Sequence, residues 1–216
     1  MSGLLLNLGS GQRPFGLPRR VYNHTTACCI CGISVELHRQ DTESYRTGPV
    51  LPRIFDPHKF VGYGEWINVD CQPKWNPDVL ADISGLPMFD DGSASVIVLH
   101  HVIEHFGCGE ADGVLREAHR LLAPGGSLLI FIPNLRTLAI RWITDRIDDY
   151  TFFVNCMGAY MGDEADRHRW HYTERSLRET LERCGQWSAI KPFDWREIQG
   201  ADLARDFWIL AVEAVK

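Results

Sequence analysis

A glycine-containing turn follows an apolar run near the N-terminus, in the order Leu-Asn-Leu-Gly-Ser-Gly over residues 6–11. Because glycine has no Cβ, a ligand can approach the backbone closely at such a turn. A dinucleotide site would place a third glycine three residues after the second, where this chain has Pro14. The turn therefore suits a cofactor without a pyrophosphate, although a plain tight turn would show the same two glycines. Its candidate cofactor-binding residues are Asn7, Gly9, Ser10 and Gly11.

Two carboxylates, Asp70 and Asp82, each follow a short apolar run that is typical of a strand. A carboxylate at a strand end can accept hydrogen bonds from both hydroxyls of a ribose, so Asp70 is the candidate for that contact. Asp82 could meet the amino group of a purine ring, while Ile83 and other apolar neighbours clasp the ring. Either carboxylate alone could equally be a hydrated loop residue. Their order along the chain, after the glycine turn, favours a nucleoside site.

Three histidines and a glutamate follow the next apolar run, as His100, His101, Glu104 and His105. The spacing His-x-x-Glu-His also occurs in zinc hydrolases, where two histidines bind the metal and the glutamate activates water. Here the motif begins at a strand end, and the sequence shows no obvious third ligand. We therefore expect no metal. Glu104 and His105 are expected to have a structural or acceptor-positioning role, or Glu104 to cap the following turn.

A second segment rich in imidazoles and aromatic rings, residues 166–173, ends at Thr173, which can cap a helix. Aromatic rings with histidines suit a pocket for a polar acceptor, and a histidine can take up a proton near neutral pH. A surface turn explains the same residues equally well. The candidate catalytic bases are His101 and His171.

Short apolar runs that alternate with helical patterns are typical of a doubly wound α/β domain with a mainly parallel sheet. Helices are expected where apolar residues recur from Ala111 to Leu122, before Pro124-Gly125-Gly126, and from Thr173 to Gly185. The expected strands are Gly3–Leu8, Trp66–Val69, Val79–Ala81, Ser95–Leu99, Ser127–Ile132, Trp187–Ile190 and Phe207–Val215.

The segment from Gly16 to Val61 does not follow this alternation of strands and helices, because it contains four prolines and its apolar residues do not recur at a regular spacing. We interpret it as an insertion between the first two strands and expect a mostly irregular cover over the cofactor cleft. Its His24, Cys28, Cys31 and His38 could form a zinc knuckle, but free cysteines in a loop are the favoured interpretation.

The length of 216 residues fits one globular domain, and the net charge of −6 gives no basic footprint for nucleic acid. The seven cysteines are irregularly spaced, which indicates reduced thiols. No segment has the length and hydropathy of a membrane span or the pattern of an export signal. We therefore expect a cytoplasmic protein with no nucleic-acid or membrane partner; the sequence does not indicate its oligomeric state.

The ordered motifs LNLGSG, INVD, ADI followed by LP, HVIEH and a helix ending in PGG resemble those of class I methyltransferases of the type 11 kind. The resemblance covers residues 3–134 apart from the insertion, and more loosely the rest of the chain. It implies a Rossmann-like sheet of about seven strands, mainly parallel with the last strand antiparallel. The long insertion departs from the family, because it replaces the usual first crossover helix.

The resemblance also implies S-adenosylmethionine as cofactor, with S-adenosylhomocysteine as product. Gly9, Ser10 and Gly11 would surround its methionine part, Asp70 would bind the ribose, and Asp82 and Ile83 would line the adenine. His100 and His101 would lie at the sulfonium and the methyl acceptor, which is an unidentified small molecule. The alternatives are a non-catalytic binding or interaction module and, less favoured because of Pro14, a nicotinamide-dependent oxidoreductase.

Overall fold

The computed structural model describes residues 4–9, 26–27, 34–35, 66–75, 77–158, 164–193 and 208–216. Its main sheet has the strand order β5-β4-β1-β6-β7-β9-β8, and β2 (Thr26–Ala27) pairs separately with β3 (Ser34–Val35). The strands of the main sheet are β1 (Leu4–Leu8), β4 (Trp66–Asp70), β5 (Val79–Leu80), β6 (Ala94–His100), β7 (Leu122–Pro133), β8 (Ala189–Pro192) and β9 (Ile209–Val215).

The first five strands of that order are parallel, whereas β9 runs antiparallel to both β7 and β8. The seven-stranded Rossmann-like sheet expected from the sequence is thus confirmed, antiparallel final strand included. The fifth strand begins at Leu122, earlier than the expected Ser127, and therefore includes the Pro-Gly-Gly segment.

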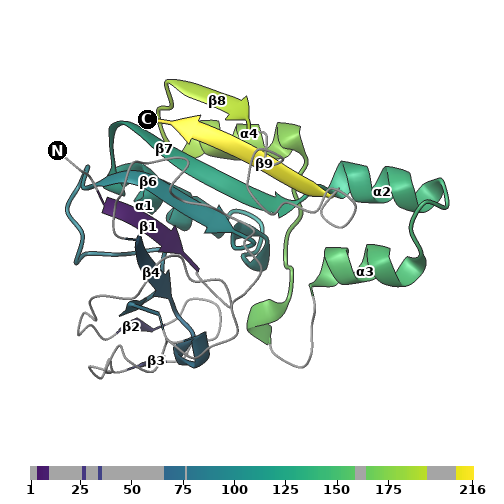
Figure 1. The fold of residues 1–216 in the computed structure, drawn as a ribbon, viewed down its shortest axis with the longest axis horizontal. Coiled ribbons are helices and arrows are strands. Elements are labelled where there is room, and N and C mark those ends of the chain that lie inside the picture. The colour runs from purple at the N-terminus through teal and green to yellow at the C-terminus, as the bar shows by residue number, and fades with distance from the viewer. Residues whose placement is uncertain are drawn as a thin grey trace.

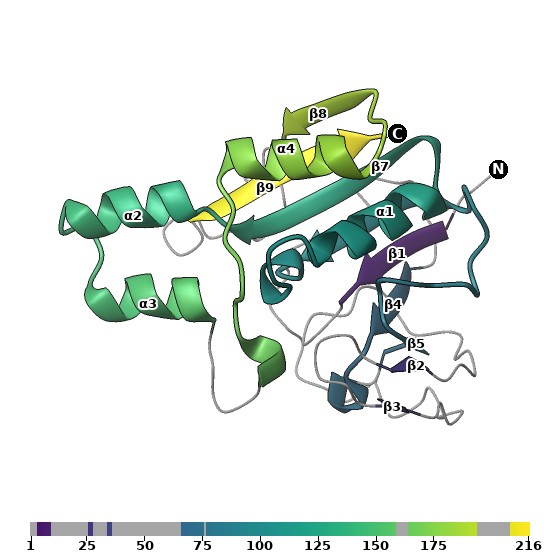
Figure 2. The ribbon, with the colours of Figure 1, turned by 180° about the vertical axis from the view of Figure 1, so that it is seen from behind.

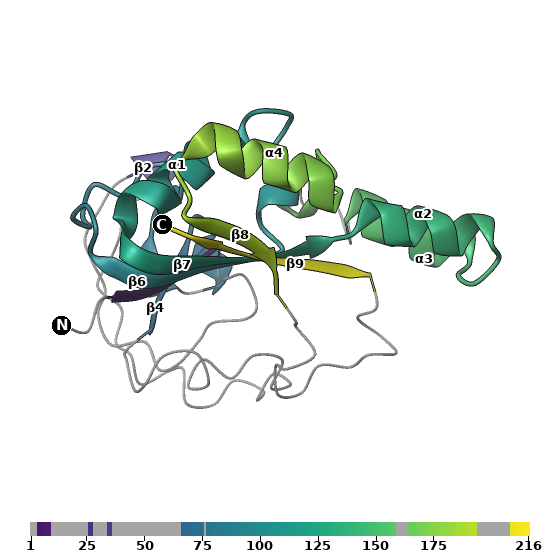
Figure 3. The ribbon, with the colours of Figure 1, turned by 90° about the horizontal axis from the view of Figure 1, so that it is seen from above.

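Two helices, α1 (Ala111–Leu121) and α4 (Glu174–Cys184), lie side by side over one face of the sheet (Figures 2 and 3). Thr173 caps α4 as expected, because its side chain accepts a hydrogen bond from the Ser176 amide in a capping box. The Asp112 carboxylate in α1 binds the guanidinium of Arg183 in α4 through two hydrogen bonds of 2.8 and 2.9 Å. An ion pair therefore connects the two helices, in addition to their packing.

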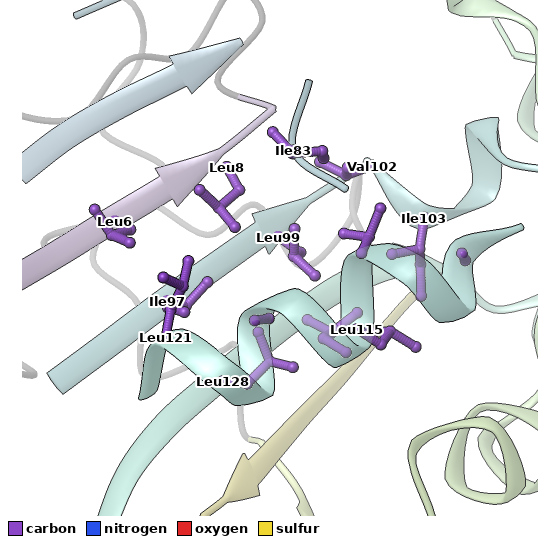
Figure 4. Close-up of a cluster of buried hydrophobic side chains, with 14 of the residues drawn as sticks. Leu6, Leu8, Ile83, Ile97, Leu99, Val102, Ile103, Leu115, Leu121 and Leu128 are labelled. Atoms are coloured by element: carbon purple, nitrogen blue, oxygen red, sulfur yellow. The ribbon is translucent and has the colours of Figure 1, made fainter. Parts of the chain in front are cut away.

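Alternate residues of the strands are buried on opposite faces of the sheet. Leu6, Ile97 and Leu128 pack against Leu115 and Leu121 of α1 in the larger core cluster (Figure 4). A smaller cluster on the other face contains Leu5, Val96, Val98, Leu129, Phe131 and Ala211. Because both faces are buried, the central strands are mainly apolar, as in a doubly wound sheet.

A helical hairpin formed by α2 (Leu135–Ile143) and α3 (Asp149–Met157) extends beyond the sheet (Figures 1 and 3). The sequence interpretation assigned no element to this segment. Asn134 and Asp148 cap the two helices by accepting hydrogen bonds from backbone amides. The Trp142 ring stacks on Phe152 with centroids 4.4 Å apart, which holds the hairpin together.

Three short 3₁₀ helices complete the described fold: η3 (Pro73–Trp75), η4 (Ile103–His105) and η5 (Glu164–Asp166). Among the described residues, Cys108, Cys156 and Cys184 are free thiols. In the described part of the chain, no helix has the length and hydropathy needed to cross a membrane.

Arg120 connects α1 to the loop after β5. Its guanidinium donates to both carboxylate oxygens of Glu117, to the carbonyls of Leu86 and Phe89, and to Asp91. Replacing Arg120 by methionine keeps the apolar stem but leaves these acceptors without their donor. We expect Arg120→Met to lower the free energy of unfolding by about 2–3 kcal/mol.

Urea denaturation of purified protein measures this change. Arg175→Met is the matched control, because Arg175 forms an ion pair with Glu179 on the surface, where its side chain is 88% exposed. That substitution should leave the free energy of unfolding almost unchanged, because an exposed ion pair contributes little to stability. Equal effects of the two substitutions would show that Arg120 does not support the loop.

Candidate functional site

A pocket that covers about 650 Å³, part of it open to the solvent, lies at the carboxyl ends of the parallel strands, where ligands bind in open α/β sheets. Residues at or just after the ends of four strands form its wall. These residues are Gly9 after β1, Asp70 at the end of β4, Asp82 after β5 and His101 after β6. The strand order reverses between β1 and β6, so the pocket lies at the topological switch point. The other described lining residues are Cys71, Gln72, Trp75, Ile83, Val102, His105, Phe106, Ala165 and Asp166.

Gly9 and Asp70 are held side by side at this edge. The Gly9 amide donates to the Val69 carbonyl over 2.7 Å, which places the glycine next to the end of β4. The Asp70 carboxylate is 6% exposed, and its Oδ1 accepts a 2.7 Å hydrogen bond from the Gln72 amide. A buried carboxylate is thus presented beside a residue that has no side chain of its own.

Gly9 has a left-handed backbone conformation with φ of +69°, and a Cβ built on it would lie 2.7 Å from Cγ2 of Val102. Both the conformation and the contact exclude larger residues. We expect Gly9→Ala to destabilise the protein by about 1–3 kcal/mol, because strain and overpacking add.

The double variant Gly9→Ala, Val102→Ala separates the two causes. Removing the Val102 methyl groups relieves the contact but not the backbone strain, so denaturation should show partial recovery relative to the sum of the two single substitutions. If the two single substitutions have strictly additive effects on the free energy of unfolding, the Val102 contact does not limit the size of the side chain at position 9.

His101 and Glu104 form a hydrogen-bonded pair at the end of β6. His101 Nδ1 lies 2.9 Å from Glu104 Oε1, and the glutamate side chain is 1% exposed. Burial opposes ionisation of Glu104, but the hydrogen bond from His101 and the nearby imidazoles of His101, His105 and His168 lower its pKa below the ordinary value. An ionised carboxylate only accepts, so the proton in this hydrogen bond belongs to His101 Nδ1 and the second ring nitrogen, Nε2, is left for the pocket.

His101 has a φ of +55°, which is uncommon for a residue other than glycine. Its amide donates to the Phe131 carbonyl over 2.8 Å, which fixes the backbone against β7. Such backbone strain concentrates at functional sites. The expected capping role of Glu104 does not occur, since η4 has no side-chain cap and Glu104 binds His101 instead.

The pocket lining includes five of the predicted site residues, namely Gly9, Asp70, Asp82, Ile83 and His101. Ser10 and Gly11 lie outside the described residues, as does most of the predicted insertion. Asp82 is held in a turn, because its Oδ1 accepts hydrogen bonds from the amide and hydroxyl of Ser84.

Asn7, His100 and His171 are not among the described lining residues. The Asn7 amide donates to Asn68 Oδ1 over 3.0 Å, and Asn68 in turn donates to Asp78 Oδ2, so the three form a buried polar ladder across β1 and β4. His171 is half-buried, and this burial lowers its pKa, although the charge of Glu104 acts in the opposite direction.

Sequence reasoning missed several lining residues, among them Cys71, Gln72 and Trp75, which directly follow β4. Their position after Asp70 was the available signal. Ala165 and Asp166 also line the pocket, from the start of the histidine-rich segment. Its His168 is held between η4 and α3, where burial lowers its pKa to about 4 although Glu104 acts in the opposite direction.

Comparisons with known proteins agree with this geometry. The family model described as a methyltransferase domain matches residues 18–185, well over half of the chain. None of the curated proteins matches. Among solved structures, a SAM-dependent methyltransferase from Archaeoglobus fulgidus aligns with a TM-score of 0.52 and 15% identity, over 100% of this chain and 86% of its own. The PH0226 protein from Pyrococcus horikoshii OT3 aligns with a TM-score of 0.53 and 14% identity, over 100% of this chain and 82% of its own. The chain therefore belongs to the class I methyltransferases.

Proposed function

We propose that the protein transfers a methyl group from S-adenosylmethionine to a small-molecule acceptor bound in the pocket at the carboxyl ends of β1, β4, β5 and β6. The observation that carries this proposal is the buried Asp70 carboxylate beside Gly9 at the switch point, in a chain of the methyltransferase family. A carboxylate in this position can accept hydrogen bonds from both ribose hydroxyls of the cofactor.

The other described lining residues fit the same ligand. Gly9 lines the pocket with backbone alone, so the methionine part could approach the chain closely there. Asp82 and Ile83 offer one carboxylate and one apolar side chain at the end of β5, which suits the amino edge and the face of an adenine.

The bound cofactor supplies an activated methyl group on a sulfonium. The chain's own contribution is to align the acceptor and, where the acceptor carries a proton, to remove it. His101 is suited to that step, because Glu104 accepts a hydrogen bond from the protonated Nδ1 of His101. The lone pair on Nε2 is then available to take up a proton. The acceptor proton would pass to Nε2, and the imidazolium so formed would be stabilised by the adjacent carboxylate.

His171 keeps its proposed role as an alternative base, and His100 keeps its proposed place near the sulfonium, since its ring meets that of His101 edge to face with centroids 4.6 Å apart. A non-catalytic binding module is the second candidate. The buried His101–Glu104 pair disfavours it, because a binding module has no need of an oriented base.

Two experiments test the proposal. Isothermal calorimetry should detect S-adenosylhomocysteine binding and no NAD binding; the reverse would make the protein a nicotinamide enzyme. Incubation of the protein with methyl-labelled cofactor and a metabolite extract should yield a labelled small product. Cofactor binding without any labelled product, from extracts of varied composition, would favour the binding module.

A further inference from the structure

Three possible metal ligands meet beside the pocket, and only one of them, Glu104, takes part in the proposed reaction, through its Oε1. Glu104 and His105 belong to η4, and His168 lies between η5 and α4. Each offers one ligand atom, and the three atoms lie within 4.8 Å of one another. No sequence pattern joins His168 to the His-x-x-Glu-His motif, and the absence of a third ligand was the argument against a metal there.

The carboxylate of this cluster has an unused oxygen. Glu104 Oε1 accepts the hydrogen bond from His101, whereas the buried Oε2 has no hydrogen-bond partner in the described structure. A buried carboxylate oxygen without a partner costs free energy, because it has lost its hydration and gained no hydrogen bond. A bound cation removes that cost, because it supplies the missing positive partner.

Both imidazoles are oriented as metal ligands are. His105 Nδ1 lies 3.1 Å from the Arg167 carbonyl, and His168 Nδ1 lies 3.1 Å from the Asn155 carbonyl. Because a carbonyl only accepts, each Nδ1 carries the proton and each Nε2 keeps its lone pair. Histidines that bind metals almost always donate their other N–H to a carbonyl or carboxylate in this way.

The backbone holds the two halves of the cluster together. The amides of Arg169 and Trp170 both donate to the Glu104 carbonyl, over 2.8 and 3.1 Å, and the His168 amide donates to the Met157 carbonyl over 3.0 Å. The rings of His105 and His168 already meet edge to face, with centroids 4.9 Å apart. The ligand atoms, which lie within 4.8 Å of one another, are thus held near the roughly 3.4 Å separation of a tetrahedral zinc site.

We propose that Glu104, His105 and His168 bind a divalent transition-metal ion, zinc by the preference of a two-histidine, one-carboxylate ligand set. Three protein ligands leave a coordination position open, and His105 places the ion at the pocket wall. On the proposed function, this position favours an acceptor that carries a hydroxyl oxygen able to coordinate the ion. The metal site itself does not depend on that function.

Titration of the metal-free full-length protein with Co²⁺ and Zn²⁺ tests the site. We expect one Co²⁺ with the weak visible absorption of nitrogen and oxygen ligands, and one Zn²⁺ that competes with it. His168→Ala and Glu104→Gln should each weaken binding at least about 10-fold. His119→Gln is the matched control, because His119 contacts the Gln186 carbonyl, away from the cluster, and it should bind as the unchanged protein does.

The cysteines of the 16–61 segment provide the competing site, and Cys28→Ser with Cys31→Ser removes it. The proposal requires that this double variant keep the cobalt spectrum and the affinity. Strong thiolate absorption that disappears in the double variant, or affinity within about 3-fold of the unchanged protein in His168→Ala, would overturn it. Calorimetry with S-adenosylhomocysteine on each variant serves as the control for folding. If the unchanged protein does not bind S-adenosylhomocysteine, this counts against the methyltransferase proposal, whereas the metal result is unaffected.

Discussion

Replacing His101 by asparagine is expected to lower turnover by about 10²–10⁴-fold, while the affinity for S-adenosylhomocysteine changes little. Asparagine tolerates the left-handed conformation of this position, so the backbone at the end of β6 should persist. The substitution removes the imidazole Nε2, which is the atom proposed to take the proton from the methyl acceptor. The measurement is the steady-state rate with an acceptor identified from the extract, alongside calorimetry with the product cofactor.

His119→Gln serves again as the control, since it removes an imidazole that lies between α1 and α4 and contacts Trp187. Its turnover should equal that of the unchanged protein. If His101→Asn retains full turnover, His101 is no base, and the same experiment with His171→Ala decides whether the second candidate takes the proton. Equal loss of rate and of cofactor affinity in His101→Asn would instead assign His101 to cofactor binding.

The sequence was sufficient to predict this edge of the pocket, because the edge depends on the order of the strands along the chain. Each strand of a parallel sheet ends at the same edge, so Gly9, Asp70 and Asp82, which follow three successive strands, had to come together. The parallel pairings of β1 with β4 and of β4 with β5 confirm this reasoning.

Asn7 shows where the same reasoning was incomplete. It lies within β1, and because strand side chains alternate between faces, it points away from the face of Leu6 and Leu8. The turn itself begins only at Gly9. The side-chain amide of Asn7 donates a hydrogen bond to Asn68. The alternation of side chains along the strand therefore indicates a structural role for Asn7, which the motif alone does not indicate.

His168 could not be connected to Glu104 from the sequence. Their contact requires the α2–α3 hairpin to leave the sheet and return the chain beside η4, and a side-chain cluster of this kind has no local period. The helix caps Asn134 and Asp148 were visible signals for the hairpin, but no sequence pattern indicated where the chain after it would return.

Replacing Asp70 by alanine is expected to weaken S-adenosylhomocysteine binding by about 1–3 kcal/mol, which is about 5- to 140-fold in Kd. The ribose hydroxyls would lose a charged acceptor in a site where Asp70 is only 6% exposed, so water replaces it poorly. Asp70→Asn, which keeps the shape and one acceptor oxygen, should lose less than the alanine variant. Calorimetry on the three proteins at one ionic strength measures the series.

Asp90→Ala is the matched control, because Asp90 is exposed and lies outside the pocket lining. Its removal changes the net charge by the same amount as Asp70→Ala and should leave the affinity unchanged. A similar loss in both alanine variants would mean that long-range charge, rather than contact with the ribose, sets the affinity. Binding by Asp70→Ala within about 0.3 kcal/mol of the unchanged protein, a difference too small for a lost charged hydrogen bond, would remove Asp70 from the cofactor site.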